Sequence, residues 1–349
     1  MHTLIASIIV FGLIIFVHEL GHFLQARIVG IRVEEFALGM GPKVLSTQKG
    51  ETVYSLRALP LGGFCRMAGQ AGEGGYKVSS VYDPGRFDQK PVWARMSVVL
   101  AGPIMNFALA VLLFFAVFGF FGIPQDYTAE IGEVMVGSPA ESVGLQEGDR
   151  VIAINGMQVN SWSEMVEIIG RHPDEKLTME IKRKSTVSTV EVTPQYDPES
   201  QRALIGITPK GRFIWQRIGI VAGFKEALLQ TWQIIVLTLE SLIGMIRGTV
   251  SAEGVAGPVG IISLIGESAR FGFFSVLNLT ALISVNLGLL NLLPIPALDG
   301  SHMLFMLIEA VRGKPINPEK ENLVHLLGFV VLMGLMLLIT YKDILRLFS

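Results

Sequence analysis

The stretch LIASIIVFGLIIFVHELGH, residues 4–22, decides the fold of this chain. Its first 14 residues carry no charge, as a membrane-spanning helix requires, yet two imidazoles and a carboxylate follow directly. Ionisable side chains at membrane depth are energetically expensive, so they usually have a function. On a helix, His18 and His22 lie one above the other, and both can bind one metal ion. Glu19 is offset by one position and would act on a water at the metal.

The composition indicates a membrane protein. Half of the 349 residues are hydrophobic and 17% are charged, which is too apolar for an ordinary soluble enzyme. Residues 98–121 and 272–298 are uncharged and long enough to cross a bilayer, and residues 326–340 are extended by apolar neighbours. Together with residues 3–26, they predict a polytopic α-helical membrane protein with four transmembrane helices in the lipid bilayer.

Several other classes of protein are disfavoured. Residues 3–17 do not have the pattern of a signal peptide, because no Lys or Arg precedes them and no cleavage-site pattern follows. Cys65 is the single cysteine, so the chain can form neither an internal disulfide nor a cysteine-based zinc site. The sequence has no basic run or nucleic-acid-binding motif, and we expect no nucleic-acid partner.

The two long segments between the expected helices differ in charge. Residues 25–95 hold 10 Lys or Arg and 6 Asp or Glu, a net charge of +4, whereas residues 122–212 hold 9 and 14, a net charge of −5. Lys and Arg near membrane ends favour the cytoplasmic side. We therefore expect the first segment to be cytoplasmic and the second to be extracytoplasmic, with the metal-binding motif near the cytoplasmic side.

The segment at residues 122–212 is expected to form an inserted α+β domain. Ser161 is a suitable cap for a helix, and the segments around it have strand patterns. The expected helix covers residues 162–171, and the expected strands cover residues 131–136, 150–155, 176–183 and 188–193. The text GSPA (137–140), GL (144–145), GDR (148–150) and ING (154–156) resembles a PDZ domain. This resemblance implies a possible peptide ligand bound at a sheet edge; the alternative is a purely structural domain.

Two other regions are harder to interpret. Residues 28–94 are rich in Gly and in short β-like runs, and we expect a small β element on the cytoplasmic face. Residues 226–246 are apolar, but their polar side chains fall on one side of a helix, which favours amphipathic membrane-associated helices in residues 213–271. A membrane span at residues 226–246 would place the C-terminal end of residues 272–298 on the side of the membrane opposite the two histidines.

A catalytic zinc site needs a third protein ligand besides the two histidines. Asp299 is favoured, because it follows NLLPIPAL (291–298), where two prolines interrupt an apolar helix. Counting the expected spans also places Asp299 on the same side of the membrane as His18 and His22. The alternative ligands are Glu34, Glu35 and His302. The two glutamates follow the first helix closely and lie in an expected strand.

Four motifs and the PDZ-like text together resemble the site-2 protease family of intramembrane zinc metalloproteases, and most of all its bacterial RseP-like group. The motifs are HELGH (18–22), LPLGGF (59–64), AGPIMNF (101–107) and NLLPIPALDG (291–300). The chain departs from the family pattern in having room for a single PDZ domain. It also reads LDGSH, with Ser301 in place of a glycine.

The resemblance implies Zn²⁺ as the cofactor, with His18, His22 and Asp299 as ligands and Glu19 as the general base. It also implies substrate-binding roles for three asparagines: Asn106, Asn286 and Asn291. The implied reaction is hydrolysis of a peptide bond within or near the transmembrane segment of a single-pass membrane protein. An anti-sigma factor or a signal-peptide remnant is the expected substrate, in the bacterial cytoplasmic (inner) membrane.

Two other functions compete with this one. A non-catalytic membrane scaffold with a structural metal site would not need Glu19, and a metal or ion transporter would be expected to show repeat symmetry between its halves. The expected organisation is a first transmembrane helix at 1–27, a β-rich loop at 28–94, a second helix at 95–121, the PDZ domain at 122–212, amphipathic helices at 213–271, a third transmembrane helix at 272–300, a cytoplasmic loop at 301–322 and a fourth helix at 323–346.

Overall fold

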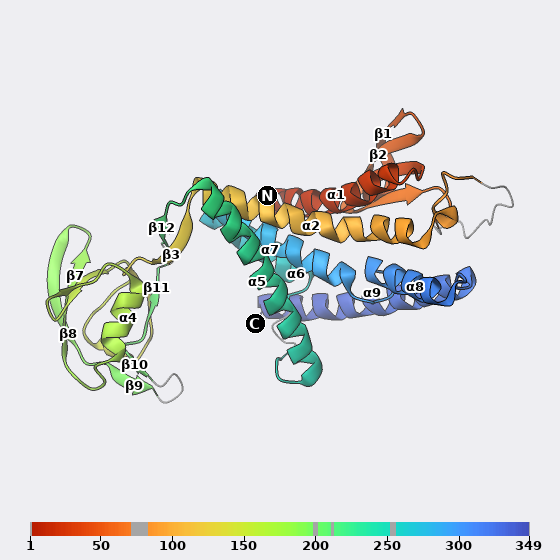
Figure 1. The fold of residues 1–349 in the computed structure, drawn as a ribbon. Coiled ribbons are helices and arrows are strands. Elements are labelled where there is room, and N and C mark those ends of the chain that lie inside the picture. The colour runs from red at the N-terminus through yellow and green to blue at the C-terminus, as the bar shows by residue number, and fades with distance from the viewer. Residues whose placement is uncertain (1, 71–82, 198–201, 211–212, 252–255, 349) are drawn as a thin grey trace. The chain divides into compact units, whose positions relative to one another are not determined.

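The computed structural model describes residues 2–70, 83–197, 202–210, 213–251 and 256–348. The chain forms two compact units, one made of Met1–Val117 with Phe224–Ser349 and the other of Phe118–Gly223. The first, here called the helical unit, consists of helices and one small sheet, and the second, here called the β-rich unit, consists mainly of short strands (Figure 1).

Long apolar helices form most of the helical unit, because in hydrocarbon a backbone must satisfy its own polar groups. Its elements are α1 (His2–Ile28), β1 (Val33–Lys49), β2 (Thr52–Met67), a 3₁₀ turn (Phe87–Gln89), α2 (Val92–Phe120), α5 (Ile220–Arg247), α6 (Pro258–Phe271), α7 (Phe273–Leu292), α8 (Asp299–Arg312) and α9 (Pro318–Phe348). Helix α2 contains Pro103, which cannot donate a backbone hydrogen bond to Val99.

Five helices of the described chain are long and apolar enough to cross a membrane, namely α1, α2, α5, α7 and α9. The protein is therefore a multi-pass helical membrane protein. Four of these helices overlap the segments expected to span, although α7 ends at Leu292, six residues before the end of the expected segment 272–298. The fifth, α5, lies where interfacial helices were expected, and the 14-residue α6 that follows it is too short to span.

The β element expected in residues 28–94 is present, but its strands are longer than the short runs in the sequence suggested. The first half of β1 pairs with both halves of β2, and the second half of β1 pairs with the first half of β2. This folded sheet packs against α1. Phe23, Phe36, Cys65, Val98 and Met306 are buried together where α1, the sheet, α2 and α8 meet.

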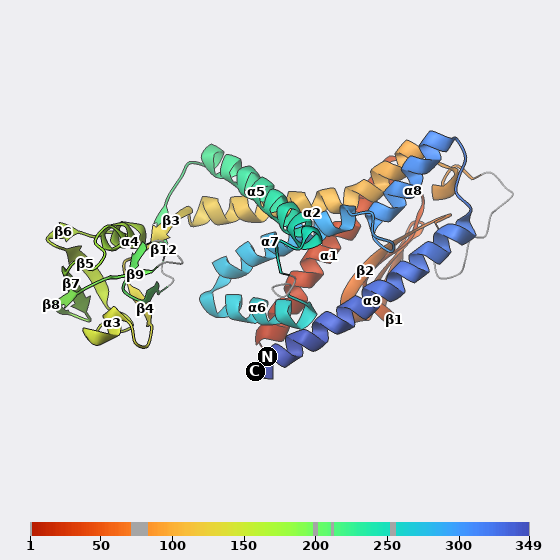
Figure 2. The ribbon, with the colours of Figure 1, turned by 90° about the horizontal axis from the view of Figure 1, so that it is seen from below.

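Helices α6 and α9 complete the helical unit. Helix α6 lies beside α1 (Figure 2), and a methyl group added at Gly266 would lie 2.5 Å from Thr3 Cγ2. The buried Asp343 of α9 accepts hydrogen bonds from the N–H groups of Gly257 and Gly260 at 3.3 and 2.8 Å. These N–H groups have no partner inside their own helix, so the carboxylate both caps α6 and ties α9 to it.

The β-rich unit confirms the secondary structure predicted for that region. Its elements are β3 (Ile123–Tyr127), β4 (Ile131–Val134), α3 (Pro139–Ser142), β5 (Arg150–Ile154), β6 (Met157–Gln158), α4 (Trp162–Gly170), β7 (Leu177–Arg183), β8 (Thr186–Val192), β9 (Gln195–Asp197), β10 (Arg202–Leu204), β11 (Ile207–Pro209) and β12 (Phe213–Gln216). The largest sheet has the order β6-β5-β7-β8. Ser161 caps α4 as predicted, because its hydroxyl accepts the N–H of Glu164.

Candidate metal centre

Three side chains that are distant in the sequence meet inside the helical unit. His18 and His22 come from α1, and Asp299 begins α8. Asp299 Oδ2 is 3.1 Å from His18 Nε2 and 3.5 Å from His22 Nε2, and the two Nε2 atoms are 3.2 Å apart. Both histidines are 7% exposed. The three side chains therefore direct potential ligand atoms to one buried point.

Small residues on α1 and α2 allow this approach. A methyl group added at Gly21 would lie 2.4 Å from the Ala101 carbonyl oxygen, so the two helix backbones are close there. A methyl group added at Gly102 would lie 2.3 Å from His22 Nε2 and 2.9 Å from His18 Cε1. Glycine at position 102 thus leaves the space in which the two rings lie.

The interruption of the apolar segment before Asp299 brings its carboxylate to the histidines. Helix α7 ends at Leu292, since a proline at 294 disfavours helical geometry in the residue before it. Asp299 then lies in the first turn of α8, where the helix dipole favours a negative charge. Gly300 is required by packing, because an added methyl group would lie 2.1 Å from the Leu293 carbonyl oxygen.

The remaining ring nitrogens are held by α2. His22 Nδ1 lies 2.8 Å from the Val98 carbonyl oxygen, so Nδ1 carries the proton and the Nε2 lone pair faces Asp299. His18 Nδ1 lies 3.2 Å from the side-chain nitrogen of Asn106. Asn106 is fully buried, and its Oδ1 has no hydrogen-bond partner among the described residues. Turning this amide by half a rotation satisfies Oδ1 with the Nδ1 proton of His18, and the His18 Nε2 lone pair then also faces the centre.

These residues fit a zinc ion. Two imidazole nitrogens and one carboxylate oxygen are donors that zinc prefers, and three protein ligands leave a fourth position open. The donor atoms of His18, His22 and Asp299 all lie within 4.8 Å of one another. Asp299 Oδ2 is buried and accepts no hydrogen bond with acceptable geometry within the described part of the chain, which a bound cation would compensate.

Two more predicted site residues border this cluster. Glu19 follows His18 directly on α1 and lies beside β2, because a methyl group added at Gly63 would lie 3.3 Å from Glu19 Cγ. Asn291, in the last turn of α7, has its side-chain nitrogen 3.5 Å from His18 Nε2.

The other predicted residues lie elsewhere. Asn286 accepts a hydrogen bond from Thr238 of α5 at 2.9 Å, and the structure does not bring it to the histidines. Glu35 accepts hydrogen bonds from Ser55 and Arg57 within the β element. His302 faces Glu321 of α9, with His302 Nδ1 3.4 Å from Glu321 Oε1.

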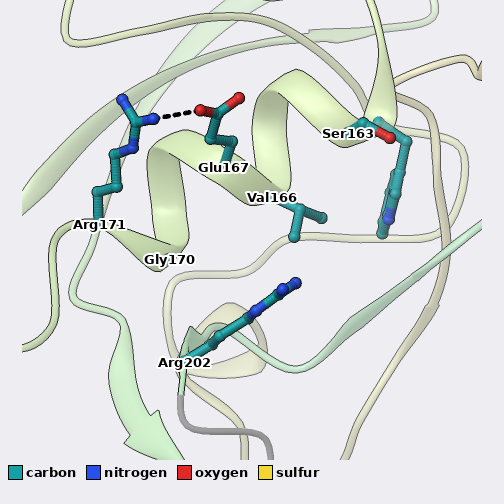
Figure 3. A pocket seen from close by; sticks show the side chains of 7 residues that line it. Ser163, Val166, Glu167, Gly170, Arg171 and Arg202 are labelled. Carbon is teal, nitrogen blue, oxygen red and sulfur yellow. Dashed lines mark hydrogen bonds and ion pairs between the residues drawn. The ribbon is translucent and has the colours of Figure 1, made fainter.

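The β-rich unit has hollows of its own along α4. A cavity of about 480 Å³ lies between α4 and Arg202 (Figure 3), and Arg171 on its rim pairs with Glu167. A second, more apolar hollow of about 250 Å³ is lined by α4 and by the chain around Gly206. No cluster of three or more His, Cys, Asp or Glu side chains able to hold a metal ion is found among the described residues of this unit.

Comparison with known proteins assigns the family. The model of peptidase family M50 matches residues 6–335. The chain belongs to peptidase family M50. The zinc metalloprotease RasP of Bacillus licheniformis is 34% identical over the whole of both chains. The regulator of sigma-W protease RasP of Bacillus subtilis is 33% identical over 99% of each. A solved PDZ domain of an SdrC-like protein from Listeria monocytogenes is 20% identical, with a TM-score of 0.21, and covers 25% of this chain and 88% of that one.

The M50 assignment and the donor set identify the chain as a zinc metalloprotease with His18, His22 and Asp299 as its candidate metal centre. Sequence reasoning found these residues in this M50 peptidase but missed others around them. The motif AGPIMNF could have indicated the close contact of Gly102 with the two histidine rings, because a glycine there precedes a proline inside an apolar helix. The contact of His325 with Ala297 could not be predicted from the sequence, because the two residues lie 28 positions apart.

Proposed function

We propose that this M50 peptidase hydrolyses a peptide bond within or near the transmembrane segment of single-pass membrane proteins. The observation that carries the proposal is the position of the donor set, which lies between apolar helices of spanning length instead of in a soluble domain. A substrate must therefore enter the membrane-embedded part of the molecule. An anti-sigma factor or a signal-peptide remnant is the substrate class that we favour.

His18, His22 and Asp299 would hold the zinc ion. When bound, zinc supplies a Lewis acid that polarises the scissile carbonyl and lowers the pKa of a water. Glu19 takes the proton of the attacking water and passes it to the leaving amine. Asn291 donates to the substrate backbone. Fully buried Asn106 orients the His18 ring, a role that its placement favours over the substrate contact implied by the resemblance.

The substrate segment must be unwound before cleavage, because the carbonyls of a helix are occupied by its own hydrogen bonds. The β1–β2 sheet lies directly beside the proposed base, since a methyl group added at Gly63 would lie 3.3 Å from Glu19 Cγ. A sheet edge can hold an extended peptide by main-chain pairing. We therefore propose that this sheet presents the unwound segment to Glu19.

The topology that we propose has four spans, with the metal centre near the cytoplasmic side of a bacterial inner membrane. The meeting of Asp299 with His18 and His22 requires the end of α7 and the end of α1 to share a face. Helix α6 leads the chain back toward the level at which α5 begins (Figure 2), so α5 and α6 together need not cross the membrane. The β-rich unit is then extracytoplasmic.

The β-rich unit is proposed to act as a PDZ-type filter that restricts substrate access. Its apolar hollow between α4 and the chain around Gly206 suits an extended peptide ligand. Deleting residues 128–208 should extend cleavage to substrates with longer extracytoplasmic domains. Unchanged discrimination by domain size, measured with a series of fusion substrates of increasing length, would contradict the filter role.

Cleavage of co-expressed single-pass proteins by wild type and Glu19→Gln tests the catalytic assignment. Glutamine keeps the shape of the side chain but cannot accept the proton, so cleavage should fall by about 10²–10⁴-fold. The zinc content per protein should stay at the wild-type level, because Glu19 is not a ligand. Wild-type cleavage by the variant would rule out Glu19 as the base, and absence of cleavage by wild type would favour the scaffold.

A further inference from the structure

Helix α9 contacts the loop that leads to Asp299 through a hydrogen bond and a close packing contact. The backbone N–H of Ala297 donates to His325 Nδ1 of α9 at 3.1 Å. One turn further along α9, Gly328 lies against Pro296, and a methyl group added there would lie 2.1 Å from Pro296 Cβ. The loop between α7 and α8 is thus held from α9 at two adjacent residues.

This loop needs such support. Ala297 has a φ of 76°, the left-handed region that a residue with a Cβ adopts only at a cost in free energy. Such conformations persist where surrounding contacts enforce them. Ala297 is two residues before Asp299, so a relaxed backbone at 297 would redirect the carboxylate.

The hydrogen bond also fixes the protonation of the His325 ring. Because Nδ1 accepts the Ala297 N–H, the proton of the neutral ring is on Nε2. His325 Nε2 faces Glu321 Oε1 at 3.8 Å. The His325 ring is stacked on the His302 ring, with the two ring centroids 4.1 Å apart. His302 Nδ1 is 3.4 Å from the same Glu321 oxygen. Glu321 therefore favours the tautomer that leaves Nδ1 free to accept.

The same tautomer argues against a second metal ion at this place. The donor atoms of His302, Glu321 and His325 are close enough together to surround a cation. A metal on His325 Nε2 would need the lone pair of a nitrogen that already carries the proton. We therefore interpret the cluster of His302, Glu321 and His325 as a group that stabilises the loop between α7 and α8.

We propose that His325 is a positioning residue for the zinc ligand Asp299, acting through the backbone N–H of Ala297, with Glu321 holding its tautomer. This inference rests on the proposed role of Asp299. Ser301 strengthens the same turn, because its hydroxyl donates to the Leu298 carbonyl at 2.7 Å. The clamp formed by His325 and Gly328 fixes the loop before zinc binds.

Two substitutions at one position separate positioning from packing. In His325→Asn the side-chain oxygen takes the place of Nδ1 and can still accept the Ala297 N–H, whereas in His325→Gln the amide takes the place of Nε2. His172→Gln in the β-rich unit is the matched control, since that ring also bonds a backbone group. All variants are full-length protein in detergent, and thermal unfolding checks that they fold.

The first readout is zinc affinity in competition with a chelator. We expect His325→Gln to weaken zinc binding about 10-fold or more, in the range typical of groups that support metal ligands, and His325→Asn to stay close to wild type. The second readout is hydrogen exchange of residues 293–298 in the zinc-free protein. Exchange should rise about 10-fold in His325→Gln, as expected for loss of one hydrogen bond, and much less in His325→Asn.

Three results would overturn the proposal. Wild-type affinity and exchange in both variants would show that the clamp is unnecessary. Equal loss in both would show that His325 acts by packing. Two zinc ions per wild-type chain, with one lost in His325→Gln, would show a second metal site instead. Should His325→Gln fail to fold, Glu321→Gln must shift both readouts in the same direction, by less.

Asp299→Asn distinguishes failure of this inference from failure of the proposed function. If that variant loses zinc while His325→Gln does not, the ligand assignment stands and the clamp is wrong. If Asp299→Asn binds zinc as wild type does, the ligand assignment is wrong. The exchange of residues 293–298 still decides the clamp in that case, because it is measured without metal.

Discussion

At the scale of single residues, the metal centre depends on space as much as on ligands. Two histidine rings and a carboxylate converge only because Gly21 and Gly102 let α1 and α2 approach closely. The histidines could be predicted from their spacing, because i and i+4 positions share a helix face whatever the rest of the fold does. The contact of His22 with the Val98 carbonyl could not, because it depends on how α2 crosses α1.

Gly102→Ala should disturb both rings. The new methyl group would lie 2.3 Å from His22 Nε2, and the rings would have to move away from Asp299. Overpacking of this kind typically costs about 1–3 kcal/mol of folding stability. We also expect zinc affinity to fall by about tenfold or more, as for loss of other groups that support ligands. Chelator competition and thermal unfolding measure the two effects.

Gly119→Ala is the control for this experiment. It also places alanine in α2, but apart from the neighbouring backbone of α2 itself no atom would lie within 4 Å of the new methyl group. Alanine is favoured over glycine in a helix, so this variant should be at least as stable as wild type. Equal zinc affinity and equal stability of the two alanine variants would show that the space at position 102 is not needed.

At the scale of elements, prediction succeeded where the pattern was local. The helix at residues 162–171 and its Ser161 cap follow from nearby residues, and so does the break in the apolar segment at Pro294. The β1–β2 sheet was expected only as short runs. Its length comes from pairing in which one half of β1 meets both halves of β2, and such a register depends on contacts between residues distant in the sequence.

The same sheet contains a buried carboxylate with several cationic neighbours. Burial alone would raise the pKa of Glu35, but hydrogen bonds from Ser55 and Arg57 and the nearby Lys43 outweigh it and lower the pKa to about 2. A carboxyl group whose pKa is lower in the folded state adds stability above its unfolded pKa. That stability is lost as the pH falls through the folded value.

Glu35→Gln should therefore destabilise the sheet in a pH-dependent way. At neutral pH we expect a loss of about 1–3 kcal/mol, the usual contribution of hydrogen bonds to a charged group. The difference from wild type should shrink as the pH falls from about 5 toward 2, because the wild-type carboxyl group then takes up its proton. Hydrogen exchange of β1 and β2 at several pH values measures it. A difference that stays constant from pH 7 to pH 2 would show that the charge of Glu35 does not support the sheet.

At the scale of the whole molecule, the metal centre constrains the topology more strongly than hydropathy does. Length and composition admit α5 as a span. One additional crossing between α2 and α7 would move the end of α7, and Asp299 with it, to the face opposite the end of α1. The 3.1 Å separation of Asp299 Oδ2 and His18 Nε2 therefore supports our proposal that α5 and α6 together do not cross the membrane. From the sequence alone, the topology could be constrained only by counting the expected spans between the two histidines and Asp299.

Cysteine labelling tests the topology directly. In a Cys65→Ala chain, cysteines are introduced at Ser185 in the turn after β7 and at Lys314 in the loop between α8 and α9, both exposed positions. With four spans, the two lie on opposite sides of the membrane. A membrane-impermeant maleimide should therefore label position 185 in spheroplasts and position 314 only after lysis. The Cys65→Ala chain alone should give no label. If the reagent reached both cysteines in spheroplasts, the four-span topology would be wrong, because positions 185 and 314 would then lie on the same side of the membrane.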